Sequence, residues 1–212
     1  MRQFNLTIPS FAFSTLLVMG HSSISLGADS QVMSGLFIEP AITYELAQTS
    51  INYPSPLSNS SGSIEGLGLG ARLGVHIDEA FFIGMDFRYS MPSFKDSSVH
   101  SNSKSISTTW GPVIGMQMPH LGMRVWGSYL VGGELNPEKY NGLDVKFLNA
   151  RGYLIGTGFR IASISLNLEY QQLKYVSTRL EQIGPFSTSS DFSSVRLSNN
   201  SWIASVSFPM AL

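Results

Sequence analysis

The sequence of 212 residues contains no cysteine. This absence excludes a disulfide scaffold, a cysteine-ligated zinc site, a thiol nucleophile and the lipidated cysteine of a bacterial lipoprotein. Charged residues are also scarce, because they make up 13% of the chain, about half the share found in an ordinary soluble domain. The 13 lysines and arginines are balanced by 14 aspartates and glutamates, so no excess positive charge is available for nucleic acid, and we expect no such partner.

Long apolar runs are missing as well. Beyond residue 28 the chain contains no stretch of about 18 consecutive apolar residues, which excludes membrane-spanning helices there. Before that point, Arg2 is the only charge, an apolar run covers 11–19, and small residues precede Asp29. This pattern predicts a secretory signal peptide over residues 1–28, cleaved after Ala28 or Gly27, and a mature domain over residues 29–212.

The mature sequence does contain a repeated alternation between apolar residues and small or polar ones, the period-two pattern of a β-strand with two different faces. Residues 64–77 show it most clearly, and it resumes over 81–91 after a short turn, so these two segments predict a hairpin. The same pattern predicts further strands over 36–47, 106–118, 121–134, 146–160, 163–173 and 201–212.

The connections between these predicted strands alternate in length. Long stretches rich in Ser, Asn and Pro cover 48–63, 92–105, 135–145 and 174–195, whereas short turns cover 78–80, 119–120 and 161–162. Eight antiparallel strands with short periplasmic turns and long extracellular loops are typical of a transmembrane β-barrel, an all-β fold. The alternative is a secreted β-sandwich, which also alternates but should have a wetter outer face than this sequence offers.

The face that we assign to lipid carries no Asp, Glu, Lys or Arg, as hydrocarbon requires when a midplane Arg or Lys costs roughly 2–4 kcal/mol. In segment 146–160 this face holds Leu148, Ala150, Gly152 and Leu154, so that Arg151 and Tyr153 point inward. Outward aromatic residues toward the long-loop ends of the strands predict an interfacial girdle, formed by Tyr44, Tyr89, Trp110, Tyr129 and Tyr170. The general preference of aromatic residues for strands is the alternative explanation.

The opposite face carries equal numbers of acids and arginines, namely Glu39, Glu45, Asp86, Glu169, Arg72, Arg88, Arg124 and Arg151. An eight-stranded barrel is only wide enough for side chains to fill it, so these charges are expected to pair and to block the lumen. In a hairpin centred on Glu79, Arg72 lies opposite Asp86, and we predict that pair specifically. A narrow or gated polar path through the same charges is the alternative.

In these features the sequence resembles the small eight-stranded outer-membrane barrels of Gram-negative bacteria, such as the OmpA transmembrane domain, OmpX and the OmpW family. The resemblance covers nearly all of residues 34–212 and rests on the signal peptide, the GLGLGARLG segment at 66–74, the rhythm of strands and loops, and the terminal alternating strand. It implies a location in the outer membrane, among its lipid and lipopolysaccharide.

The resemblance also implies insertion by the outer-membrane assembly machinery, which reads a last strand like the one that holds Trp202, Val206 and Phe208. Members usually end on Phe, whereas this chain continues with Pro209-Met210-Ala211-Leu212.

The sequence shows no metal or cofactor constellation, and we expect no cofactor and no enzymatic activity. The one loop group with suitable residue types consists of His100, Ser101, Ser103 and Asp96, and Ser-rich loops produce such groups by chance. The leading hypothesis is a monomeric barrel with a structural or surface-interaction role, whose loops at 48–63 and 174–195 would contact an extracellular partner. The alternatives are a narrow channel for small or apolar solutes and a lipid-modifying enzyme.

Overall fold

The computed structural model describes residues 35–212 except 54, 56, 57, 79, 97–100, 119, 140–142 and 193. The predicted signal peptide lies outside the described residues. The described residues include no helix that is long and apolar enough to cross a membrane. The strands are β1 (Gly35–Asn52), β2 (Ser60–Ile77), β3 (Phe81–Ser90), β4 (Ser93–Asp96), β5 (Ser101–Met118), β6 (Met123–Leu130), β7 (Gly132–Pro137), β8 (Leu143–Ile161), β9 (Ile164–Ile183), β10 (Phe186–Phe192), β11 (Arg196–Ser207) and β12 (Met210–Ala211).

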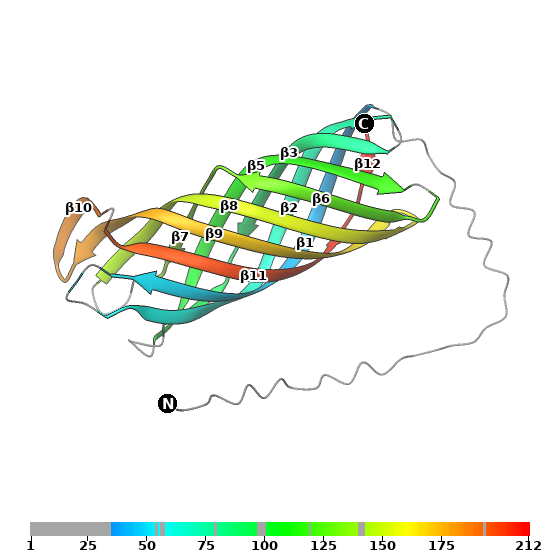
Figure 1. The fold of residues 1–212 in the computed structure, drawn as a ribbon. Coiled ribbons are helices and arrows are strands. Elements are labelled where there is room, and N and C mark those ends of the chain that lie inside the picture. Colours follow the sequence, from blue (N-terminus) through cyan, green and yellow to red (C-terminus); the bar gives the residue numbers. More distant parts are fainter. Residues whose placement is uncertain are drawn as a thin grey trace, which may run out of the picture.

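These strands form one antiparallel sheet that closes on itself (Figure 1). β4 continues the path of β3 and β7 continues that of β6, so the closed ring has eight strands. β9 pairs with β8 and β11, and β11 pairs with β1, which joins the end of the sheet to its beginning. Closure gives the backbone amides partners within the protein, as the membrane interior requires. The predicted eight-stranded barrel is confirmed, and the β-sandwich was the wrong alternative.

The chain end remains part of the barrel wall. Beyond Phe208, β12 pairs with Phe37 and Ile38 of β1, and the amide of Leu212 donates to the carbonyl of Leu36 at 2.9 Å. The C-terminus lies at the opposite end of the barrel from the β9–β10 hairpin (Figure 1). Short turns mark the periplasmic end of such barrels, so β10 belongs to the extracellular end.

The strands are longer than the sequence pattern predicts. β1 runs to Asn52, β2 begins at Ser60 and β9 runs to Ile183, so much of the predicted loops 48–63 and 174–195 is strand. The predicted loops 92–105 and 135–145 are shortened in the same way, because β4, β5, β7 and β8 extend into them.

The sequence pattern underestimates the strands because, outside the membrane, the apolar residues lie on the inward face and the polar residues on the outward face. At the extracellular end of β1, Thr49 and Ile51 are buried, while Gln48, Ser50 and Asn52 are exposed. Apolar-inside and polar-outside is the ordinary pattern of a sheet in water. A search for apolar residues on the outward face therefore stops at the membrane boundary, although the strand continues.

Asn149 interrupts the alternation of β8. Its φ of 57° lies in the left-handed region, which Asn adopts more readily than most residues. On the extracellular side of Asn149 the odd-numbered Phe147 is buried, whereas on the membrane side the even-numbered Ala150 and Leu154 are buried. The inward face of β9 changes in the same way, because the odd-numbered Tyr175 is buried on the membrane side and the even-numbered Thr178 is buried on the extracellular side.

This reversal of the inward and outward faces at Asn149, called the phase switch below, corrects the predicted faces of segment 146–160. On the membrane side of Asn149, Arg151 and Tyr153 are exposed on the outside of the barrel, and Ala150 and Leu154 fill its inside. The predicted phase holds only on the extracellular side of Asn149, because a period-two pattern carries no information about a single left-handed residue.

An apolar belt surrounds the barrel on its outward face. In water such a continuous apolar surface would be untenable, so it marks the wall that hydrocarbon covers. The belt is formed by Ile42, Leu67, Leu69, Leu73, Ile83, Phe87, Ile114, Met123, Val125, Ile155, Phe159, Leu166, Leu168 and Val206.

Candidate functional site: a packed lumen

Three layers of side chains fill the lumen. The layer nearest the periplasmic end is aromatic, because the rings of Phe37, His76 and Phe82 pack with centroids 4.6 to 6.0 Å apart. A charged layer comes next, and an apolar layer lies on the extracellular side.

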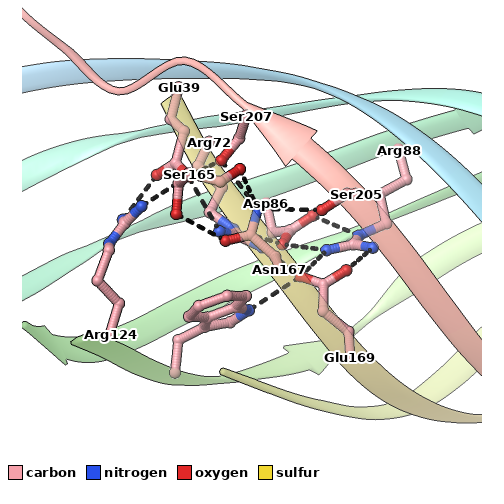
Figure 2. A network of polar contacts seen from close by, with 11 residues as sticks. Glu39, Arg72, Asp86, Arg88, Arg124, Ser165, Asn167, Glu169, Ser205 and Ser207 are labelled. Carbon is pink, nitrogen blue, oxygen red and sulfur yellow. Dashed lines mark hydrogen bonds and ion pairs between the residues drawn. The ribbon is translucent and has the colours of Figure 1, made fainter. Parts of the chain in front are cut away.

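Arg72 on β2 is the centre of the charged layer (Figure 2). Its Nε donates to Asp86 on β3 at 3.1 Å, its Nη1 donates to Glu39 on β1 at 3.4 Å, and its Nη2 donates to Glu169 on β9. The β2–β3 register places Arg72 directly opposite Asp86, which confirms the predicted pair. The contact to Glu39 also joins neighbouring strands, because Glu39 lies directly opposite Arg72 in the β1–β2 register, whereas the contact to Glu169 on β9 depends on closure of the barrel.

Two more arginines complete this layer. Arg88 donates to Asp86 from Nε at 2.8 Å and to Glu169 from Nη1 at 2.7 Å. Arg124 on β6 donates from both terminal nitrogens to both carboxylate oxygens of Glu39, at 2.8 and 2.7 Å. The cluster therefore contains three guanidinium groups and three carboxylates, its net charge is zero, and each of its six side chains is at most 12% exposed.

Trp126 is a member of this cluster that charge patterning could not identify. Its indole Nε1 donates to Glu169 at 3.0 Å, and the Arg72 guanidinium carbon lies 4.2 Å from the centroid of its ring. The indole thus supplies both a hydrogen bond and a cation–π contact. The sequence offered one signal for its role, because the alternation placed Trp126 on the inward face of β6 as an apolar residue among polar ones.

Small polar side chains satisfy the remaining acceptors. Ser207 donates to Glu39 at 2.6 Å, and Asn167 donates to Ser205 and Ser207 at 3.1 and 2.9 Å (Figure 2). Buried charges are tolerated when most of their hydrogen-bonding capacity is used, and these residues supply part of it, although the Nε of Arg124 has no hydrogen-bond partner among the described residues.

The apolar layer closes the lumen on the extracellular side of the charges. Its fully buried members come from β6, β7, β8, β9 and β11 and are Leu130, Leu135, Leu154, Leu173, Tyr175 and Leu197. Two cavities at the level of the charges have volumes of about 20 and 10 Å³. Each has space for about one water molecule. The described lumen is therefore a packed core.

Two of the predicted lumen charges lie outside the cluster. Glu45 is buried but lies apart from the ion pairs, where Asn199 donates to it at 3.3 Å. Arg151, predicted inside, is exposed on the outside as a result of the phase switch at Asn149. The other six residues of that prediction form the cluster.

The predicted girdle residues Tyr44, Tyr89, Trp110 and Tyr129 are all exposed on the outward face, and Tyr170 is partly exposed there. Two further aromatic residues complete the band. Tyr153 is the direct cross-strand partner of Tyr129, and Trp202 packs on Tyr170 with ring centroids 5.2 Å apart. Tyr153 was missed because the phase of β8 was inverted. Trp202, Val206 and Phe208 of the predicted assembly strand share this outward face.

Most of the loop group with catalytic residue types, namely His100 and the side chains of Asp96 and Ser101, lies outside the described residues. Among the described residues, no group of three or more His, Asp or Glu could hold a metal ion.

A closed eight-stranded barrel with an uncharged apolar belt and a filled lumen defines an outer-membrane β-barrel protein, and the outer membrane is its location. Solved structures agree with this class. The chain is similar to OprG from Pseudomonas aeruginosa, with a TM-score of 0.54, 7% identity, and coverage of 86% of this chain and 99% of that one. It is similar to the outer-membrane protein AlkL, with a TM-score of 0.50, 15% identity, and coverage of 85% and 92%.

A third similar structure is Neisserial surface protein A, with a TM-score of 0.45, 14% identity, and coverage of 82% of this chain and 97% of that one. At such identities the likeness concerns the fold alone. No protein-family model matches the chain, and no curated protein matches it.

Proposed function

We propose that this protein is a non-conducting outer-membrane barrel that acts at the cell surface. The observation that carries the proposal is the double closure of the lumen. A neutral cluster of paired charges blocks the middle of the barrel, and an apolar layer blocks the extracellular side. A water-filled ion path would need a continuous polar opening, and the cavities at the charged layer are of single-water size.

The strands supply the surface for the proposed role. Beyond the aromatic girdle, β1, β2, β4, β5, β8 and β9 continue as a sheet whose inner face is apolar, with buried Ile51, Ile64, Phe94 and Phe147 that belong to the same apolar cluster as the lumen. A rigid sheet presents a pre-formed surface, which lowers the entropic cost of binding an extracellular partner. We propose that this extension, rather than long flexible loops, is the contact surface of a monomeric barrel.

Insertion by the assembly machinery belongs to the same proposal. Trp202, Val206 and Phe208 share the outward face of the terminal strand, and the residues after Phe208 pair with β1. In this proposal Phe208 corresponds to the terminal Phe of the outer-membrane barrels that the sequence resembles, and β12 is an addition after it.

Single-channel recording of the refolded mature protein in a planar bilayer tests the closed lumen. The wild type is expected to show no steady conductance. The control is a variant that opens both layers, Arg72→Ala/Asp86→Ala combined with Leu154→Ala/Leu173→Ala, which is expected to conduct if it retains heat-modifiable gel mobility. Steady conductance by the wild type would contradict the proposal and make transport the working function.

A further inference from the structure

The phase switch at Asn149 brings two cations together on the outside of the barrel. Arg151 of β8 and Lys174 of β9 are direct partners in the strand register, and both are exposed on the outward face. Residues directly opposite each other in an antiparallel pair have Cβ atoms about 5 Å apart. Like charges at this separation repel, so the arrangement is unfavourable unless an anion binds between them.

A third cation extends the pair along the wall. Ser198 of β11 is the direct partner of Lys174, and Arg196 lies two residues further along β11 on the same exposed face. Such diagonal neighbours lie about 7–8 Å apart, within reach of long side chains. Arg151, Lys174 and Arg196 thus form a basic patch on three adjacent strands.

Nothing within the described chain neutralises this basic patch. Its three residues form no ion pair with a described acid. Two acids nearer the extracellular tip bind other cations, since Glu181 binds Lys146 at 2.9 Å and Asp191 binds Arg179 at 2.7 Å. The basic patch is therefore open to an anion from outside the described chain.

The position of the basic patch along the barrel axis, relative to the membrane, indicates the source of that anion. Arg151 lies two residues beyond Tyr153 on β8, which corresponds to about 7 Å along the strand. Tyr153 belongs to the aromatic girdle, and aromatic girdles lie at the level of the lipid headgroups. The basic patch therefore lies at the headgroup level of the outer leaflet, while the apolar belt below it is positioned for acyl chains.

We propose that Arg151 and Lys174, with Arg196 at the edge, bind the phosphate of a phosphorylated glycolipid in the outer leaflet. The guanidinium group supplies a planar pair of donors and the ammonium group a point charge, a combination suited to a phosphate monoester. This site is separate from the lumen and does not depend on whether the barrel conducts.

The test measures how lipid partitions to the refolded mature protein. Bilayer nanodiscs of phosphatidylcholine contain increasing fractions of diphosphorylated lipid A, and the lipid retained by the barrel is counted by native mass spectrometry. The test variant is Arg151→Gln/Lys174→Gln. The matched control is Lys95→Gln/Lys104→Gln, which removes the same charge from exposed residues of β4 and β5. Heat-modifiable gel mobility shows that each variant is folded.

We expect the test variant to need about tenfold more lipid A for half-occupancy, whereas the control matches the wild type. Dephosphorylated lipid A should bind wild type and test variant equally, and excess inorganic phosphate should not displace lipid A. Wild-type affinity in the test variant, or an equal loss in the control, would overturn the proposal. Complete displacement by inorganic phosphate would also overturn it, by showing a site for free anions.

Discussion

Arg124 and Glu39 face each other across the lumen, on strands β6 and β1 that are not neighbours in the barrel wall. Both terminal nitrogens of Arg124 donate to the carboxylate, at 2.8 and 2.7 Å. A contact of this kind ties opposite sides of the barrel together, whereas the Arg72–Asp86 pair joins adjacent strands. The lumen is consequently cross-braced, and its stability should depend on which carboxylate is neutralised.

Replacing Glu39 and Glu45 in turn tests this dependence. Glu39→Gln removes the charge that compensates Arg124, and breaking a buried ion pair in this way should lower the free energy of unfolding by about 3 kcal/mol. Glu45→Gln should change it by less than about 1 kcal/mol, because Glu45 forms no ion pair among the described residues. Urea unfolding in phosphatidylcholine vesicles measures both values, and equal losses would argue against the cross-brace.

The three tryptophans should report different surroundings. Trp126 is 3% exposed in the lumen, whereas Trp110 and Trp202 are on the lipid-facing side. In variants that keep one tryptophan and replace the others by Phe, brominated lipid tails should quench Trp110 and Trp202 strongly and Trp126 weakly. Fluorescence in vesicles of matched lipid composition makes the comparison. Equal quenching of all three would mean that β6 presents the opposite face.

The absence of cysteine allows a direct test of the phase switch in β8. Arg151→Cys should react with a water-soluble thiol reagent at least about tenfold faster than Leu154→Cys, because Leu154 is fully buried in the lumen. The labelling rate of folded protein in vesicles gives the answer.

A second pair of variants checks the cause of that switch. Asn149→Gly keeps access to the left-handed region and should preserve the labelling pattern, whereas Asn149→Val should slow folding or lower stability by roughly 1–2 kcal/mol. Faster labelling at Leu154→Cys than at Arg151→Cys would contradict the phase switch and support the orientation that the sequence pattern predicted, with Leu154 outward and Arg151 inward.

The extracellular hairpin should loosen in acid. Arg179 donates to Asp191 at 2.7 Å and lowers the pKa of that carboxyl below its usual 3.8. A lowered carboxyl pKa stabilises the folded hairpin above pH 3.8 and ceases to do so as the pH falls through the lowered value.

Hydrogen exchange of the β9–β10 amides should therefore accelerate below pH 3.8 relative to the intrinsic rate, while amides of β1 and β2 remain protected. Asp191→Asn should show the faster opening already at neutral pH and lose its acid dependence. An acid dependence that persists in Asp191→Asn would assign the effect to another group.

The sequence by itself determined the kind of fold. Strict alternation across 64–77 and 81–91, short turns at one end and an outward face without charge favour a closed transmembrane sheet over the β-sandwich, because closure satisfies the backbone amides and the uncharged face suits lipid. The Arg72–Asp86 contact was also within reach, because a hairpin's register follows from its turn.

Only the tertiary structure decided which charges meet across the lumen and which stay apart. Glu39 and Arg124 are 85 positions apart and approach each other through closure of the ring, which no local pattern records. The left-handed Asn149 moved Arg151 from the predicted lumen network to the outer wall beside Lys174. Alternation carries only the parity of a position, so one residue outside the extended conformation reverses the face of every residue that follows.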